Sequence, residues 1–210
     1  LLYFYMVIPK KVFLVAKKHY SKLPYHNFDH ALHVLKSVRQ LIKRYESSGG
    51  KVDYLPLCHA AIFHDAGYAL NHKKLGFQSK EHLSADIAYR ELKRLGYSNN
   101  HANKARKIIL ATRREAEPKT VEEKILRASD LEGMKGKYSE FMKNNNALKE
   151  EFYLLNKKKL TLKQWKLMTK KQIMHYLAQD IKLTPRYYDS KGRSLFHKRV
   201  LNNLQKFLDA

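Results

Sequence analysis

The chain has 210 residues, of which 44% are apolar and 29% charged. This length and composition can bury one sizeable core, which excludes intrinsic disorder, and the chain has no collagen-like or coiled-coil repeat. Its 42 basic and 19 acidic residues give a formal charge of +23. A field of that sign attracts nucleic acid, nucleotides and other phosphoesters, although a solvated lysine-rich surface explains the same charge.

Apolar residues recur with helical spacing along almost the whole chain, and no segment alternates with the period of two that marks a strand. Ser98 and the pairs Thr120 with Glu123 and Thr161 with Gln164 are typical of helix starts. The pattern therefore predicts an all-α protein. Its helices are expected over residues 10–19, 28–46, 54–69, 80–95, 99–113, 121–134, 137–156, 162–181 and 194–208.

No Gly-, Pro- or Ser-rich stretch is long enough for an interdomain linker, so residues 1–210 are predicted to form one compact helical domain. The alternative treats residues 135–210, poorer in histidine and richer in lysine, as a C-terminal helical extension packed on it. Residues 1–8 are too short to span a bilayer and lack the pattern of a signal peptide. The single cysteine, Cys58, lies in an apolar run and indicates a packed thiol in a reducing compartment. We therefore expect a cytoplasmic protein without a membrane partner, whose oligomeric state the sequence leaves open.

Histidine and aspartate occupy three places where the helical pattern predicts apolar side chains. His30 lies on the apolar stripe of one helix, and Asp130 lies on that of another. His64 and Asp65 interrupt a segment that is apolar on every side. A buried carboxylate needs a cation or strong donors, and two imidazoles with two carboxylates form a ligand set for a divalent metal. The alternative is a His–Asp network that fixes helix packing and binds nothing.

Adjacent residues on a regular helix diverge by about 100°. Joint metal binding by His64 and Asp65 therefore requires a favourable orientation of the helix that carries them.

The order of these residues resembles the HD superfamily of metal-dependent phosphohydrolases, and within it the small helical group of predicted HD-type phosphohydrolases. The resemblance rests on Tyr25-His26-Asn27-x-x-His30, Phe63-His64-Asp65-Ala66-x-Tyr68, Glu81-x-x-Ser84-Ala85, Asp130, Ile181-x-x-Thr184-Pro185-x-Tyr187 and Arg199-x-x-Asn202-x-Leu204. It covers nearly the whole chain and implies an all-α HD/phosphodiesterase-type domain.

The resemblance implies that the metal ligands are His30, His64, Asp65 and Asp130. It implies one divalent ion, which this ligand set would accept as Mn²⁺, Fe²⁺, Co²⁺, Ni²⁺ or Zn²⁺, with Mg²⁺ as a further candidate. Members with two metals carry more histidines before the last aspartate, where this chain has Arg113-Arg114-Glu115. That departure argues against a second ion, unless His82 or His101 takes part.

Two further roles follow from the resemblance. His26 matches the histidine that cyclic-nucleotide phosphodiesterases of the superfamily use as proton donor to the leaving oxygen. Glu81 matches an acidic position that could orient or deprotonate the attacking water. The basic residues nearest in sequence, and hence candidates for binding phosphate, are Lys73, Lys80, Arg113 and Arg114, each of which also fits a solvated surface charge.

The leading hypothesis is a metal-dependent hydrolase of a nucleotide-like phosphomonoester or phosphodiester, in which the metal activates water. A second hypothesis is a basic nucleic-acid- or nucleotide-binding module with a non-catalytic metal site. A third is a helical interaction protein whose His/Asp cluster is structural.

Overall fold

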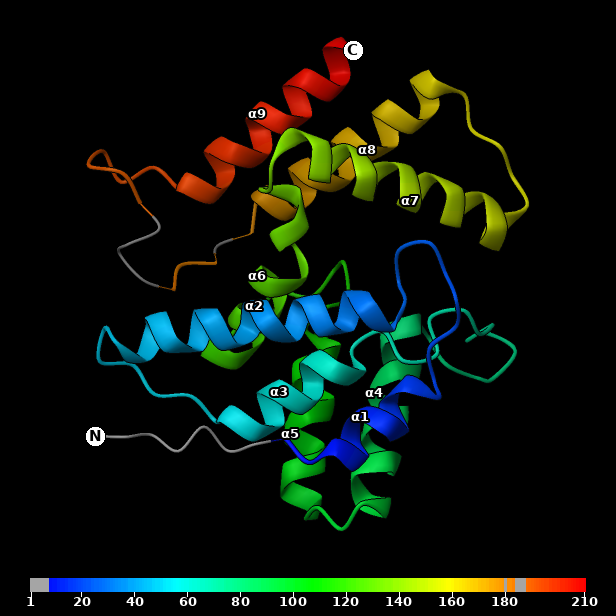
Figure 1. Cartoon of the computed structure of the whole chain (residues 1–210), viewed down its shortest axis with the longest axis vertical. Helices are drawn as coiled ribbons and strands as arrows, with labels where there is room; N and C mark the ends of the chain where they lie inside the picture. The colour runs from blue at the N-terminus through cyan, green and yellow to red at the C-terminus, as the bar shows by residue number, and fades with distance from the viewer. Residues whose placement is uncertain (1–7, 180, 184–187) are drawn as a thin grey trace. The chain divides into compact units, whose positions relative to one another are not determined.

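The structure is a computed structural model that describes residues 8–179, 181–183 and 188–210. These residues form nine α-helices and one short 3-10 helix, and their only β pairing is an isolated bridge between Tyr188 and Ser194 (Figure 1). The all-α prediction is confirmed. Among these helices, none has both the length and the apolar character that a membrane span requires. Residues 184–187 of the C-terminal motif, and the opening residues 1–7, lie outside the described residues.

The chain divides into two compact units. The first contains the chain up to Lys22 together with His26–Ser129, and the second contains Leu23–Tyr25 and Asp130–Ala210. This boundary lies close to residue 135, where the sequence analysis places the start of the alternative C-terminal extension. That residues 1–210 act as one domain stays a prediction.

Each described helix corresponds to one expected from the sequence (Figure 1). The first unit contains α1 (Lys10–Lys17), α2 (Phe28–Glu46), α3 (Tyr54–Phe63), α4 (Lys80–Arg94), α5 (Asn99–Leu110) and α6 (Val121–Asp130), whose last residue begins the second unit. The second unit contains η1 (Glu132–Met134), α7 (Tyr138–Asn156), α8 (Leu162–Leu177) and α9 (Leu195–Asp209).

Several helices end earlier than the sequence analysis expects; α5, for example, ends at Leu110 rather than 113, and α8 at Leu177 rather than 181. Two of these early ends have a local cause. The helix over 54–69 ends at Phe63, because Gly67 has a φ of +80° that a right-handed helix does not accommodate. The helix over 121–134 ends at Asp130, and the chain tightens into the 3-10 turn of η1, where the Met134 N–H donates to Leu131 O.

Helix α3 forms the centre of the first unit and packs against α1, α2, α4 and α5. Residues 56–63 are all buried, which is what a segment apolar on every side predicts. Cys58 lies within this run, and its burial raises the pKa of its thiol to about 11. The thiol is therefore protonated at neutral pH, as expected of a packed side chain rather than a nucleophile.

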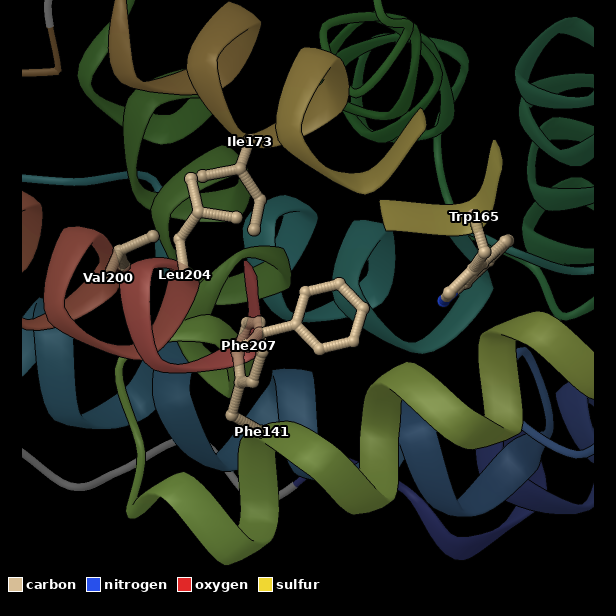
Figure 2. Close-up of a cluster of buried hydrophobic side chains, with 6 residues drawn as sticks. All are labelled: Phe141, Trp165, Ile173, Val200, Leu204 and Phe207. Carbon is tan, nitrogen blue, oxygen red and sulfur yellow. The ribbon is translucent and has the colours of Figure 1, made fainter. Parts of the chain in front are cut away.

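The lysine-rich second unit has a hydrophobic core of its own between α7, α8 and α9. In Figure 2, Leu204 of α9 is turned toward Ile173 of α8. The Trp165 indole is buried, and its Nε1–H donates to Asn145 Oδ1 at 2.6 Å, so a polar side chain inside this core has a partner. The buried members of the cluster are Phe141, Trp165, Ile173, Val200, Leu204 and Phe207.

A histidine pair, with one ring buried and the other half-buried, joins α3 to α5 in the first unit. His59 is fully buried, and its Nδ1 lies 2.8 Å from Nε2 of His101. The ring of Tyr97 stacks on His101 with centroids 4.7 Å apart. Burial, with a smaller effect of neighbouring His101, lowers the pKa of His59 to about 3. His59 is therefore neutral in the folded chain at every pH near neutrality.

This pair predicts a loss of stability in mild acid. The unfolded chain binds a proton at His59 below pH 6.5, while the folded chain does not until about pH 3. Between these values the free energy of unfolding falls as pH falls, so we expect His59 alone to cost about 2 kcal/mol between pH 7 and pH 5. Urea denaturation at both pH values measures this. His59→Gln should lose less stability on acidification than the wild type, and His33→Gln, at an exposed position, should lose as much. An undiminished loss in His59→Gln would contradict the prediction.

Candidate metal centre

Four side chains expected to bind metal lie together in the structure. One ligand atom from each of His30, His64, Asp65 and Asp130 lies within 4.8 Å of all the others. Asp65 Oδ2 lies 3.0 Å from His64 Nε2 and 3.5 Å from His30 Nε2. The structure therefore brings together residues that are 100 positions apart in the chain, and their metal binding stays a prediction.

The first turn of α2 positions His30. Asn27 is the N-cap of this helix, and its side-chain oxygen accepts a hydrogen bond from the His30 N–H at 3.1 Å. This is the usual way in which asparagine begins a helix. The Tyr-His-Asn-x-x-His motif thus has a local structural role in addition to its proposed chemistry.

His64 and Asp65 stand where α3 ends and residues 64–69 form successive turns. The N–H of Ala66 donates to Phe63 O, and the N–H of Tyr68 donates to Asp65 O at 3.0 Å. The two adjacent side chains nevertheless approach each other at 3.0 Å. The side chains of His64 and Asp65 can therefore reach one metal ion because they lie at the end of α3. The sequence analysis expects a continuous helix there.

Hydrogen bonds to the segment that follows α1 and to α4 fix this turn. Gly67 N–H donates to the backbone oxygen of His19 at 2.9 Å, and Ser84 Oγ donates to the backbone oxygen of Ala66 at 2.7 Å. A Cβ added at Gly67 would lie only 2.8 Å from Ile87 Cδ1. The glycine after the His-Asp pair and the serine of the Glu-x-x-Ser motif are therefore structural residues of the turn.

Gly67→Ala tests this role of the turn. Alanine meets the left-handed backbone and the Ile87 side chain together, so we expect the free energy of unfolding to fall by about 2–3 kcal/mol. Gly76→Ala is the matched control, because Gly76 has a φ of +78° but open space where its Cβ would lie. It should lose only the backbone part, about 1 kcal/mol. Chemical denaturation compares the two, and equal losses would show that the contact with Ile87 is unimportant.

The protonation of the cluster suits a cation. His64 Nδ1 lies 2.9 Å from Ala61 O; because a carbonyl only accepts, Nδ1 carries a proton, and in the neutral ring Nε2 presents a lone pair. Burial acts to raise the pKa of Asp65, but the imidazoles of His64, His26 and His30, when protonated, lower it by more, so the pKa lies below its usual value and the carboxyl is ionised. Asp65 Oδ2 is buried and accepts no hydrogen bond from any described residue. A carboxylate oxygen in this state fits a metal ligand.

His26 lies beside the cluster. Its ring is 5.8 Å from the ring of His30, centroid to centroid, and stacks on the ring of Tyr68 with centroids 3.8 Å apart. Lys80 Nζ lies 3.5 Å from the centroid of the same tyrosine. Lys80 is thus the basic candidate that these contacts link to His26. Sequence reasoning places Tyr68 in a motif but does not identify it as a site residue, because only the fold brings its ring onto His26.

The remaining candidates for catalysis and phosphate binding also lie in the first unit. Glu81 follows Lys80 in the first turn of α4, and within the described chain it makes no hydrogen bond or ion pair with the four residues. Lys73 and Arg114 are exposed. Arg113 Nε donates to Leu110 O. The proposed roles of all four in catalysis or phosphate binding stay predictions.

The two histidines considered for a second ion have other neighbours. His82 Nδ1 lies 3.0 Å from Ser79 Oγ, and burial, followed by the charge of Arg113, lowers its pKa. His101 contacts His59, as described above. Over the described residues, the cluster around Asp65 is the one group of three or more potential ligands.

Comparison with known families agrees with this centre. A family model described as an HD domain matches residues 27–132, a stretch that spans half of the chain and contains all four clustered residues. No curated protein matches the chain. HD domains are all-α and bind divalent metal ions, as expected from helices that bring two histidines and two aspartates together. The chain belongs to the HD domain family.

Proposed function

We propose that this protein is a metal-dependent hydrolase of phosphoric esters. Membership of the HD family indicates the superfamily of metal-dependent phosphohydrolases. The observation that carries the proposal is the convergence of two imidazoles and two carboxylates around Asp65 Oδ2, a buried ionised oxygen that accepts no hydrogen bond from the described residues.

The residues that would bind the ion are His30, His64, Asp65 and Asp130. Imidazole and carboxylate ligands suit a single Mn²⁺, Fe²⁺, Co²⁺, Ni²⁺ or Zn²⁺, and Mg²⁺ is a further candidate. When bound, such an ion lowers the pKa of water toward neutrality and polarises a phosphoryl oxygen.

The chain's own side chains would supply proton transfer and charge. His26, next to His30, would donate a proton to the leaving oxygen, since an imidazole does this efficiently near neutral pH. Glu81 would orient the attacking water. Lys80 would offset the charge of the phosphate, with Lys73, Arg113 and Arg114 as weaker candidates for the same role.

The substrate would be a nucleotide-like phosphomonoester or phosphodiester. The charge of +23 attracts such anions and raises their local concentration. A reducing, cytoplasmic setting, which the buried thiol of Cys58 favours, belongs to the same proposal.

A panel of ions and substrates tests the function. Metal-free protein is given each divalent ion in turn, with nucleoside monophosphates, cyclic nucleotides, 4-nitrophenyl phosphate and bis(4-nitrophenyl) phosphate. We expect hydrolysis that requires an ion, stops with a chelator, disappears in His64→Ala and persists in His33→Ala. His33 is the matched control because it is exposed on α2, one turn from His30.

The panel also separates the alternative function. Metal bound at full occupancy with no turnover of any phosphoester would overturn the hydrolase. If that protein also bound single-stranded RNA or DNA with a steep dependence on salt, it would be a nucleic-acid-binding module with a non-catalytic metal site.

A further inference from the structure

Tyr68 is the centre of a three-layer stack in the first unit. The imidazole of His26 lies 3.8 Å from its ring centroid with the two planes 15° from parallel. The ammonium of Lys80 lies 3.5 Å from the same centroid. Two groups at these distances cannot share one face without overlapping, so His26 and Lys80 cover opposite faces of the tyrosine.

The stack joins three segments that surround the candidate metal centre. His26 immediately precedes the N-cap of α2, and Tyr68 belongs to the turn that carries His64 and Asp65. Lys80 is the first residue of α4, whose N-cap Ser79 accepts a hydrogen bond from the His82 N–H. One aromatic ring therefore connects the metal-ligand turn to the residue expected to donate the proton.

Tyr68 and Lys80 together restrict the His26 ring more than Tyr68 alone would. Tilting the imidazole out of its plane would break the face-to-face stack on Tyr68. The cation on the far face of Tyr68 opposes a movement of that ring, since an ammonium is attracted to the aromatic face. The stack therefore sets the plane in which the His26 ring nitrogens lie.

We propose that Tyr68 is the positioning residue of His26, and that Lys80 stabilises the Tyr68 ring from the face opposite His26. This inference rests on the proposed function in one respect, the role of His26 as proton donor to the leaving oxygen. Both faces of Tyr68 are covered, so its ring positions a catalytic side chain and does not stack on a substrate base.

Leaving-group dependence tests the proposal with the full chain. A nucleoside 5′-monophosphate has a poor leaving group, an alkoxide that needs a proton, whereas 4-nitrophenyl phosphate has a good one, 4-nitrophenolate, that does not. In Tyr68→Leu we expect kcat to fall about ten- to a hundredfold on the nucleotide and less than about threefold on the nitrophenyl ester. His26→Gln should show the same selective loss. Tyr68→Phe keeps the ring and should recover most of the activity on the nucleotide.

A merely structural role for Tyr68 predicts a different result. In that case Tyr68→Leu would lower turnover of both substrates by the same factor, which would overturn the proposal. Tyr89→Leu is the matched control, because Tyr89 on α4 also has a cation near its ring, with Arg106 Cζ at 5.9 Å from the centroid, but is outside the stack. It should leave both rates unchanged.

A second readout separates failure of this inference from failure of the proposed function. The Tyr68 ring shields the ring protons of His26, whose NMR signals are assigned by their loss in His26→Gln. We expect these signals upfield in the wild type and in Tyr68→Phe, and displaced downfield in Tyr68→Leu. If no phosphoester is hydrolysed, the proposed function fails and these signals alone decide the positioning of His26. Unmoved His26 signals in Tyr68→Leu overturn the inference whether or not the protein is an enzyme.

Discussion

Asp65→Asn is expected to remove the metal ion and the hydrolytic activity that depends on it. Asp65 Oδ2 lies 3.0 Å from His64 Nε2 and 3.5 Å from His30 Nε2, and an amide neither carries its charge nor binds a cation as well. Mutating a residue that only hydrogen-bonds a metal ligand lowers metal affinity by up to about a hundredfold. Removing a ligand itself should lower the affinity by more than that. Elemental analysis of gel-filtered protein and titration calorimetry measure it.

Asp29→Asn is the matched control for this variant. Asp29 is exposed in the first turn of α2 and next to His30 in sequence, so it tests whether any lost carboxylate near the centre lowers metal content. We expect it to keep a full complement of metal. A folded Asp65→Asn protein, checked by circular dichroism, that still carries one ion per chain would refute the ligand set.

Arg127→Met is expected to lower the free energy of unfolding by about 3–5 kcal/mol. Arg127 has 0% of its surface exposed, and its Nη2 donates to the backbone oxygens of Ala111, at 2.8 Å, and of Arg113. These carbonyls follow the end of α5, so one guanidinium of α6 satisfies the polar groups of a buried helix end. Methionine fills a similar volume but removes the donor to Ala111 O, and it leaves Arg113 O with the Ala116 N–H alone.

Two other variants make the effect of Arg127 measurable. Arg127→Lys keeps the charge but not the forked donors, so it should lose less stability than Arg127→Met and still fold. Arg90→Met removes an exposed arginine that forms an ion pair with Asp86, and should change stability by less than about 1 kcal/mol. Urea denaturation compares the three. A loss in Arg127→Met no larger than in Arg90→Met would contradict a structural role for the buried guanidinium.

The sequence predicts the helices well because most of them carry one apolar face and a recognisable first residue. Ser98 and Thr161 are the N-caps of α5 and α8, as expected. The segment over 54–69 is different, since a run that is apolar on every side has no period to show where it stops. Gly67 is the signal in the sequence for its end, because a glycine there allows the positive φ that a right-handed helix does not accommodate.

Contacts through space limit what the sequence predicts of the site. The cluster of His30, His64, Asp65 and Asp130 is an expectation from apolar faces and from family resemblance, and the structure supplies the distances. The sequence does not predict the contacts of Arg127, because its partners are backbone oxygens. It does not predict those of Tyr68 either, because His26 and Lys80 come from two distant segments. The C-terminal motif shows a similar limit: it includes Asn202, whereas the buried asparagine is its neighbour Asn203, which donates to Met134 O.

The hydrogen bonds that fix residues 66 and 67 come from protein atoms alone, namely Ser84 Oγ and the His19 carbonyl oxygen. They hold the backbone of the turn that carries the imidazole of His64 and the carboxylate of Asp65 without a contribution from an ion. Exchange of one cation for another should then proceed at constant backbone conformation, and the choice among ions should follow each ion's own preference for coordination number and angle. The protein would then discriminate between metals through the coordination preferences of the ions and their availability, and not through a rearrangement of the backbone.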